Sequence, residues 1–169
     1  MAAASGGSES ALPVSRPARG ARRRAARLRR ARRQASLLLA IGVGGALGAL
    51  GRYAISLALP AAPGQMPWGV FIINVSGALA LGFVLTILAE QFPRSRMARP
   101  LIGTGFIGAY TTFSTWMVDA VSLVRRGDAA TAAAYLALSL IAGLAAVVIG
   151  MAAARSLARL RRGIQQEAT

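Results

Sequence analysis

A run of small and hydroxyl-bearing residues interrupts the third of four apolar stretches in the chain. It reads Gly-Thr-Gly-Phe-Ile-Gly-Ala-Tyr-Thr-Thr-Phe-Ser-Thr-Trp and covers residues 103–116. A helix that faces lipid keeps an apolar surface, and non-helical backbone at membrane depth survives only where protein or water satisfies its polar groups. A break rich in Gly and Thr inside a membrane span therefore predicts an ion or solute site.

Aromatic and hydroxyl side chains in this run suit a small anion. Phe113 and Trp116 lie three residues apart, so a continuous helix places them on one face. The positive edge of each ring attracts an anion without a fixed charge that would trap it. The donors that replace the anion's water would be the hydroxyls of Ser114 and Thr115 and the amide of Asn74 in the preceding span. Ordinary aromatic packing, and for Asn74 a hydrogen bond to another helix, are the alternative interpretations.

Backbone carbonyls in the same run suit a hard cation. If the helix breaks near Gly108 and Thr111, their carbonyls lose their partners inside the helix. Hard cations such as Na⁺ bind oxygen ligands, so a buried Na⁺ is a reasonable partner for them.

Polar residues also mark the first and fourth apolar stretches. Tyr135, Ser139 and Gly143 recur every four residues and share one face of the fourth. That polar stripe fits either an ion path or hydrogen bonds between helices. Arg52 lies about 10 Å inside the first stretch, and it either extends its side chain to the interface or serves an anion.

Two of these patterns together resemble the CrcB/Fluc family of fluoride channels. They are Asn74-x-x-Gly77 and Gly108-x-x-Thr111-Thr-Phe-Ser-Thr-Trp116, on different spans and in the family's order. The family usually has Phe where this chain has Trp116. The resemblance covers residues 38–154.

The resemblance implies a fluoride-specific channel that passively exports cytoplasmic fluoride and so protects against its toxicity. It implies an antiparallel dimer and, at Arg52, an entrance vestibule for anions. It also implies a structural, untransported Na⁺ held by the carbonyls of Gly108 and Thr111. The residues that it places along the ion path are Asn74, Phe113, Ser114, Thr115, Trp116, Tyr135 and Ser139.

Composition excludes several other classes. Of the 169 residues 55% are hydrophobic, and the chain has neither Cys nor His, which removes disulfides and the usual ligands of zinc, haem and iron–sulfur clusters. We expect no enzyme. The apolar stretches cover residues 36–59, 68–90, 101–124 and 129–154, and each is long enough to cross a bilayer. The predicted fold is therefore an all-α integral membrane protein with four transmembrane helices, of which the third is broken.

The chain divides into three predicted regions: an arm (1–36), a channel domain (37–154) and a basic tail (155–169). Ten arginines in the arm predict disorder in water and a helix from about Ala21 on anionic lipid. A topology anchor on lipid head groups is favoured over a transit peptide. A nucleic-acid partner is not expected, because no aromatic residue interleaves the arginines to stack bases.

Arginine is distributed unevenly across the predicted spans. With four spans, one side of the membrane carries seventeen arginines and the other only Arg125 and Arg126. Positively charged segments stay in the cytoplasm, so both termini are predicted there, in a multi-pass protein of the cell membrane. An antiparallel homodimer needs a chain that inserts both ways. The partner is therefore either a second copy, with the bias overridden by dimerisation, or an oppositely oriented paralogue.

Two other functions compete with a channel. A small proton-coupled exporter of the multidrug type needs a carboxylate inside the membrane. Here Glu90 and Asp119 lie toward the ends of their spans, and the first span has no acidic residue. A membrane scaffold that transports nothing is the third possibility, and it predicts no ion flux.

Overall fold

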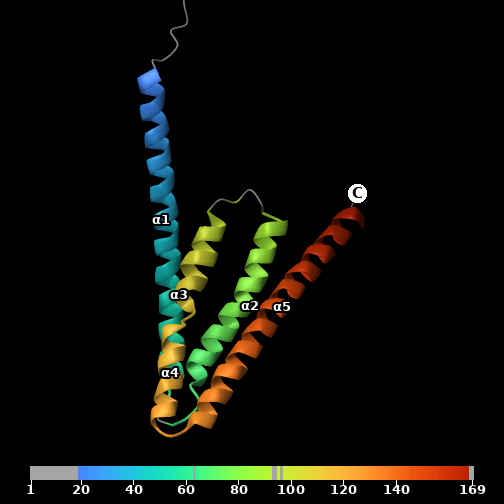
Figure 1. Ribbon diagram of the computed structural model, residues 1–169. Coiled ribbons are helices and arrows are strands. Elements are labelled where there is room, and N and C mark those ends of the chain that lie inside the picture. The colour runs from blue at the N-terminus through green and yellow to red at the C-terminus, as the bar shows by residue number, and fades with distance from the viewer. Residues whose placement is uncertain (1–18, 63, 93–94, 96, 168–169) are drawn as a thin grey trace, which may run out of the picture. The chain divides into compact units, whose positions relative to one another are not determined.

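The computed structural model of the chain describes residues 19–62, 64–92, 95 and 97–167. Every regular element in that part of the chain is a helix, as Figure 1 shows, and the all-α class is confirmed there. The elements in order are α1 (Arg19–Ala58), α2 (Trp68–Glu90), the π-helix η1 (Arg99–Ile107), α3 (Gly108–Tyr110), α4 (Ser114–Arg125) and α5 (Ala129–Glu167).

Among the described residues, three helices contain a stretch long and apolar enough to cross a bilayer, and the chain is a multi-pass membrane protein. These helices are Gly20–Ala58, Trp68–Glu90 and Ala129–Arg161. The second coincides with the span predicted from sequence. The predicted third span, residues 101–124, is divided among η1, α3 and α4, whose lengths of 9, 3 and 12 residues are each too short to cross alone.

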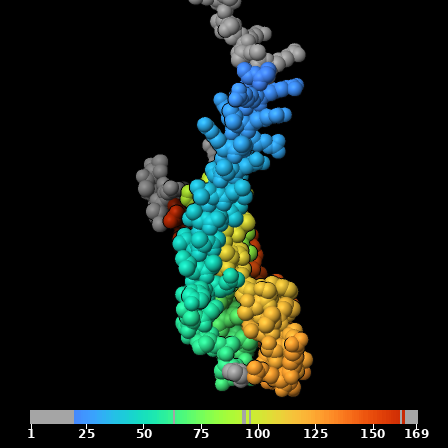
Figure 2. Space-filling view, turned by 90° about the vertical axis from the view of Figure 1, so that its left-hand side faces the viewer, coloured from blue at the N-terminus to red at the C-terminus, as the bar shows by residue number. Residues whose placement is uncertain are grey.

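The chain forms two compact units, residues 1–35 and 36–169. In the first unit the structure describes residues 19–35, which belong to α1, and residues 20–35 are all exposed. Figure 2 shows their long side chains standing out from the helix. The disorder expected for residues 1–18 falls outside the described residues, whereas the described part of the arm is helical from Arg19. The boundaries of the predicted arm, domain and tail stay predictions.

Within the second unit, α2 and α5 run side by side and their backbones touch (Figure 1). A Cβ atom on Gly82 of α2 would overlap the carbonyl of Val147, and one on Gly150 of α5 would overlap the carbonyl of Leu79. Each helix therefore supplies a glycine at the place where the other's backbone crosses it. Small residues allow this approach in membrane helices, where close packing and not the hydrophobic effect holds helices together.

A second close approach joins α1 to η1. A Cβ on Gly44 would overlap the carbonyl of Leu101, and one on Gly48 would overlap that of Phe106. Gly44-x-x-x-Gly48 places two small residues on one face, a pattern that lets another helix approach closely without specifying which one. On its other side, η1 also contacts α2. The segment that carries the hydroxyl-rich run is thus held between two spanning helices.

A tight turn joins α4 to α5. Gly127 has φ +86°, a left-handed conformation that glycine adopts without strain, and its N–H donates to the carbonyl of Val124. The Oδ1 atom of Asp128 then accepts the N–H of Thr131 at 3.1 Å and caps the first turn of α5. This turn packs α4 along α5, with Ala120 and Leu123 of α4 buried against Ala132 and Tyr135. Arg94 and Arg96, which contribute to the predicted charge bias, lie outside the described residues.

Candidate functional site

The hydroxyl-rich run leaves the helical conformation between α3 and α4. Thr111 has ψ 158°, an extended conformation, and α4 begins only at Ser114. The Asn74 side chain of α2 binds the backbone exposed by this break. Its Nδ2 donates to the Thr112 carbonyl, and its Oδ1 accepts the Thr112 N–H, both at 2.9 Å. Asn74 therefore satisfies both backbone groups of Thr112, which buried backbone requires.

The Thr112 side chain closes the other end of the break. Its Oγ1 accepts the backbone N–H of Thr115 at 3.2 Å and donates to the Thr115 hydroxyl at 3.0 Å. The Ser114 hydroxyl lies 3.4 Å from the same oxygen. Thr112 thus caps the first turn of α4, and it groups three hydroxyls at the start of that helix. Sequence reasoning gave Thr112 no role of its own, although a Thr three residues before Thr115 is a helix-start signal.

These two bonding patterns leave particular carbonyls without their usual helix donors. In an α-helix the N–H of Thr112 would bind the Gly108 carbonyl, and that of Thr115 would bind the Thr111 carbonyl. Here Asn74 takes the first N–H and the Thr112 hydroxyl takes the second. Gly108 and Thr111 are the two residues whose carbonyls the sequence analysis assigned to Na⁺. Neutral carbonyl oxygens are suitable ligands for a hard cation, so the donor set fits that group.

A cavity of about 250 Å³ lies beside the break, between α2, α4 and α5. The residues that line it are Asn74, Ala78, Trp116, Ser139, Leu140, Gly143, Leu144 and Val147. The cavity is therefore lined by three of the side chains predicted to lie on the ion path: Asn74, Trp116 and Ser139. Gly143, the third member of the predicted polar stripe, lines it as well.

Two hydrogen-bond donors that line this cavity are buried without a partner: the indole Nε1 of Trp116 and the hydroxyl of Ser139. The hydroxyl of Tyr135 does not line the cavity and interacts with the Asp119 carboxylate. Tyr135 is fully buried, and its ring lies 6.5 Å from that of Trp116 at 64°. An unpaired buried donor costs about 1–3 kcal/mol, so a native protein retains two together only where something else binds them.

The two aromatic residues of the run lie in different surroundings. The rings of Phe113 and Trp116 are 5.6 Å apart at 61°, an edge-to-face arrangement. Trp116 faces the cavity, whereas 71% of the Phe113 side chain is exposed. Ser114 and Thr115 are exposed as well. The run therefore presents one ring toward its own chain and one ring with two hydroxyl residues outward.

Arg52 stands apart from this constellation. It lies on α1, is half-buried and does not line the cavity, and its carbonyl accepts the Ser56 hydroxyl at 3.0 Å. Its neighbour Gly51 faces the ring of Tyr110. The vestibule assigned to Arg52 by resemblance stays a prediction, as do the roles of the path residues.

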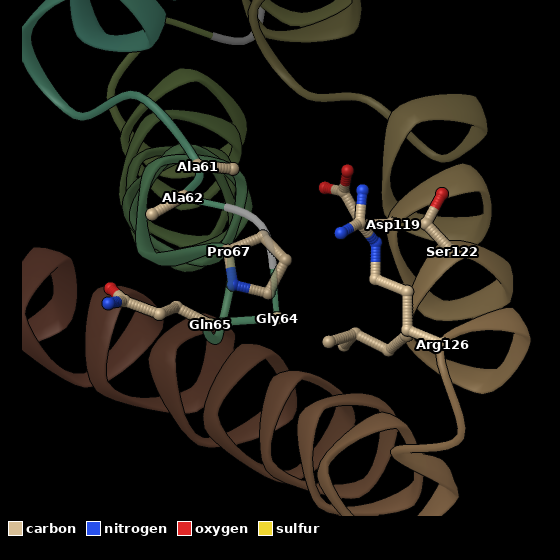
Figure 3. A pocket seen from close by; sticks show the side chains of 9 residues that line it. Ala61, Ala62, Gly64, Gln65, Pro67, Asp119, Ser122 and Arg126 are labelled. Atoms are coloured by element: carbon tan, nitrogen blue, oxygen red, sulfur yellow. The ribbon is translucent and has the colours of Figure 1, made fainter.

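A second, smaller pocket of about 150 Å³ lies where the α1–α2 connection meets α4 (Figure 3). Asp119, Ser122 and Arg126 contribute to it from α4, and Gln65 contributes from the connection. The Oδ2 atom of Asp119 is buried, and the carboxylate interacts with the Tyr135 hydroxyl of α5. Sequence reasoning placed Asp119 near a span end and gave it no role. Asp119 lies one helical turn after Trp116, and this spacing is the sequence feature that could have indicated that the two side chains share a face of α4.

The family of the chain follows from comparison with known proteins. Residues 39–151 match the family described as CrcB-like protein, camphor resistance (CrcB). The chain belongs to this CrcB-like family. The match contains the break, Asn74 and the cavity, whereas the helical arm at 19–35 and the end of α5 lie outside it.

Several CrcB-like relatives are named fluoride-specific ion channels. FluC 2 of Nocardia farcinica is 43% identical over 120 residues, which is 71% of this chain and 86% of the relative. FluC 1 of Mycobacterium bovis is 45% identical over 126 residues, covering 74% of this chain and 94% of the relative. FluC 3 of Streptomyces avermitilis is 44% identical over 131 residues, 77% of this chain and 64% of the relative. The relatives are named as ion channels, which are not a class of enzyme.

Proposed function

We propose that this chain forms a fluoride channel that lets fluoride leave the cytoplasm down its gradient. The observation that carries the proposal is the cavity wall, where unpaired buried donors from Trp116 and Ser139 lie beside Asn74 in a CrcB-like chain. Fluoride enters cells as neutral HF and ionises inside. An open path for the anion is therefore sufficient to lower its cytoplasmic concentration.

Neutral donors suit fast passage of a small anion. Fluoride is strongly hydrated, so a path must replace its water with close hydrogen-bond donors that bind weakly enough to release it. The hydroxyl of Ser139 and the indole N–H of Trp116 supply such donors. Aromatic edges add attraction without a fixed charge. Asn74 has one amide N–H left after its bond to Thr112, and this hydrogen is available to the ion.

The proposal makes η1, α3 and α4 together a fourth, broken span. The support is that η1 lies against α1 and α2, while α4 lies against α5, so the segment follows the spanning helices along its length. Asn74 binds the N–H and the carbonyl of Thr112, and the Thr112 hydroxyl binds the N–H of Thr115, so protein groups satisfy these three backbone groups of the break. This is the condition under which irregular backbone is tolerated at membrane depth.

The outward surface of the break supports a dimer. Phe113, Ser114 and Thr115 are exposed in a segment that the proposal places inside the membrane. Hydroxyls facing hydrocarbon are unfavourable, and a second protein chain would cover them. An antiparallel partner would place an equivalent break opposite this one at similar depth. The partner is a second copy or an oppositely oriented paralogue.

A structural Na⁺ is proposed at the carbonyls of Gly108 and Thr111. The support is that both carbonyls lose their helix donors to Asn74 and Thr112. Bound there, the ion would neutralise the negative ends of these carbonyls and stabilise the broken conformation. We propose that it stays in place during transport.

The exposed arginines of the helical arm are proposed to rest on anionic lipid. Residues 20–35 are all exposed and include eight arginines, each of which is attracted to an anionic surface by about 1 kcal/mol. Together with the basic tail, this charge places both termini in the cytoplasm by the positive-inside rule.

The deciding experiment is efflux from liposomes that contain the purified protein. A fluoride electrode should record efflux when a K⁺ ionophore balances the charge, and liposomes loaded with chloride should show none. Flux that requires a proton gradient would favour the exporter, for which the partly buried Asp119 carboxylate is the specific observation. Equal fluoride and chloride flux would contradict a fluoride-specific channel. If no partner chain gave any flux, the remaining function would be a membrane scaffold that transports nothing.

A further inference from the structure

We propose that Thr112 is a positioning residue that couples the anion path to the cation site. The inference rests on the proposed function, and it concerns a side chain to which neither the sequence analysis nor the comparisons assign a role. Thr112 would touch neither ion. It would act through Thr115, whose hydroxyl it orients, and through Thr111, whose carbonyl it leaves available.

The Thr112 side chain is the hub of a short network. Thr112 is 7% exposed, and its Oγ1 lies within 3.4 Å of three groups: the N–H and the hydroxyl of Thr115 and the hydroxyl of Ser114. Because Oγ1 donates its hydrogen to the Thr115 hydroxyl, that hydroxyl's own hydrogen points elsewhere. Thr115 is an exposed residue of the break, so Thr112 leaves the Thr115 hydroxyl to donate to a group other than Thr112.

The same side chain decides where the N–H of Thr115 binds. Two acceptors compete for it: the Thr112 hydroxyl one turn back and the Thr111 carbonyl, which a regular helix would use. The hydroxyl holds it at 3.2 Å. If the hydroxyl were removed, the N–H would lose this partner, and extending α4 backward onto the Thr111 carbonyl would satisfy it.

Loss of this one hydroxyl would therefore have two effects. The Thr115 hydroxyl would lose its orientation, which weakens the anion path. The Thr111 carbonyl would gain a donor, which weakens its binding of a cation. The backbone pair between Thr112 and Asn74 uses no atom of the Thr112 side chain, so it would persist.

Thr112→Val tests the inference, because valine matches threonine in shape and lacks the hydroxyl. Thr112→Ser keeps the hydroxyl and should restore the behaviour of the wild type. Thr86→Val is the matched control, since the Thr86 hydroxyl donates at 2.8 Å to the Gly82 carbonyl of its own helix and lies outside the break.

Two readouts are needed, and one of them does not depend on transport. The first is the melting temperature of the purified protein in Na⁺ compared with a large organic cation. The second is the fluoride efflux rate as a function of Na⁺ concentration. Wild type, Thr112→Ser and Thr86→Val should melt at higher temperature in Na⁺. Thr112→Val should lose this shift, require about tenfold more Na⁺ for half-maximal flux and conduct more slowly at saturation, as expected for one lost hydrogen bond.

The outcomes separate this inference from the proposed function. If wild type conducts fluoride and Thr112→Val keeps both its Na⁺ shift and its rate, the inference is wrong and the channel stands. If Thr112→Ser behaves as poorly as Thr112→Val, the hydroxyl is not the cause and the inference is again wrong. If wild type shows the Na⁺ shift but no fluoride flux, the proposed function fails, whereas the melting data still test the carbonyl.

Discussion

Asn74 and Thr112 lie 38 residues apart in the chain and bind each other twice, amide to backbone, at 2.9 Å in each direction. This pair joins α2 to the break between α3 and α4. Its two bonds resemble those that a residue of a neighbouring strand makes in a sheet, because one side chain supplies a donor and an acceptor to the N–H and carbonyl of one residue. The break is thus fixed by a residue outside its own segment.

Asn74→Asp should abolish fluoride efflux and lower stability. Aspartate cannot donate to the Thr112 carbonyl, so it leaves that buried oxygen facing a carboxylate, at a cost of about 1–3 kcal/mol. It also places a negative charge at the cavity wall. Melting temperature in detergent and efflux from liposomes measure the two effects. A variant that melts and conducts like wild type would show that the Asn74 amide serves neither purpose.

Phe113→Ile should reduce fluoride efflux with little change in the melting temperature of the single chain. The ring is 71% exposed, so its own chain gains little from packing it, whereas ring-edge attraction worth about 1 kcal/mol is lost from the anion. We expect a reduction of about fivefold to tenfold in the initial efflux rate. Efflux at the wild-type rate in a folded protein would remove Phe113 from the path.

Trp116→Phe should keep conduction or improve it. The smaller ring retains an aromatic edge 5.6 Å from Phe113, and it removes a buried N–H that has no partner. Efflux measurements beside Phe113→Ile check the two positions under identical conditions. A loss of efflux with Phe at this position would mean that the indole N–H is itself a required donor.

Gly82→Ala should destabilise the protein, whereas Gly42→Ala should not. A methyl group on Gly82 would overlap the Val147 carbonyl, and forcing two packed backbones apart costs about 1–3 kcal/mol. Gly42 has no atom within 4 Å of an added Cβ, and alanine favours helix by about 0.5–1 kcal/mol. Thermal unfolding in detergent compares the two variants. Equal melting temperatures would mean that α2 and α5 separate easily at this crossing.

A reporter fused to the C-terminus should be active on the cytoplasmic side alone. In the predicted topology, seventeen arginines lie on the cytoplasmic side of the membrane, and only Arg125 and Arg126 lie on the other side. Two fusions measure the location of the C-terminus: one carries an enzyme that is active only in the cytoplasm, and the other carries an enzyme that is active only outside it. Comparable activity of both fusions would mean that the chain inserts in both orientations, and it would restore the homodimer.

Local pattern determines how much of this molecule is predictable from sequence. The second span was placed at Trp68 and Glu90, where α2 begins and ends, because interface residues mark both ends of an unbroken apolar stretch. The approach at Gly44 and Gly48 was also predictable, because spacing alone puts two small residues on one face. Both signals lie within a single helix.

Relations between helices were beyond the reach of sequence pattern. Asn74 was identified as a buried amide, but nothing near it in sequence points to Thr112 as its partner. The sequence predicts a helix in the arm only on anionic lipid and from about Ala21, whereas α1 begins at Arg19; the disorder argument considers only charge and the lack of a core, and arginine has good intrinsic helix propensity. Thr112 was counted among the hydroxyls, yet its role as a cap depends on backbone geometry that begins at Thr111.

The location of the tryptophans has a practical consequence for optical measurement. The chain contains two, and Trp68 is half exposed at the start of α2, whereas Trp116 faces the cavity. Replacing Trp68 by Phe would leave a single indole, buried at the cavity wall with a free N–H. The wavelength of its fluorescence emission would then shift with the hydration of the cavity. The protein thus contains its own spectroscopic label at the wall of the cavity between α2, α4 and α5.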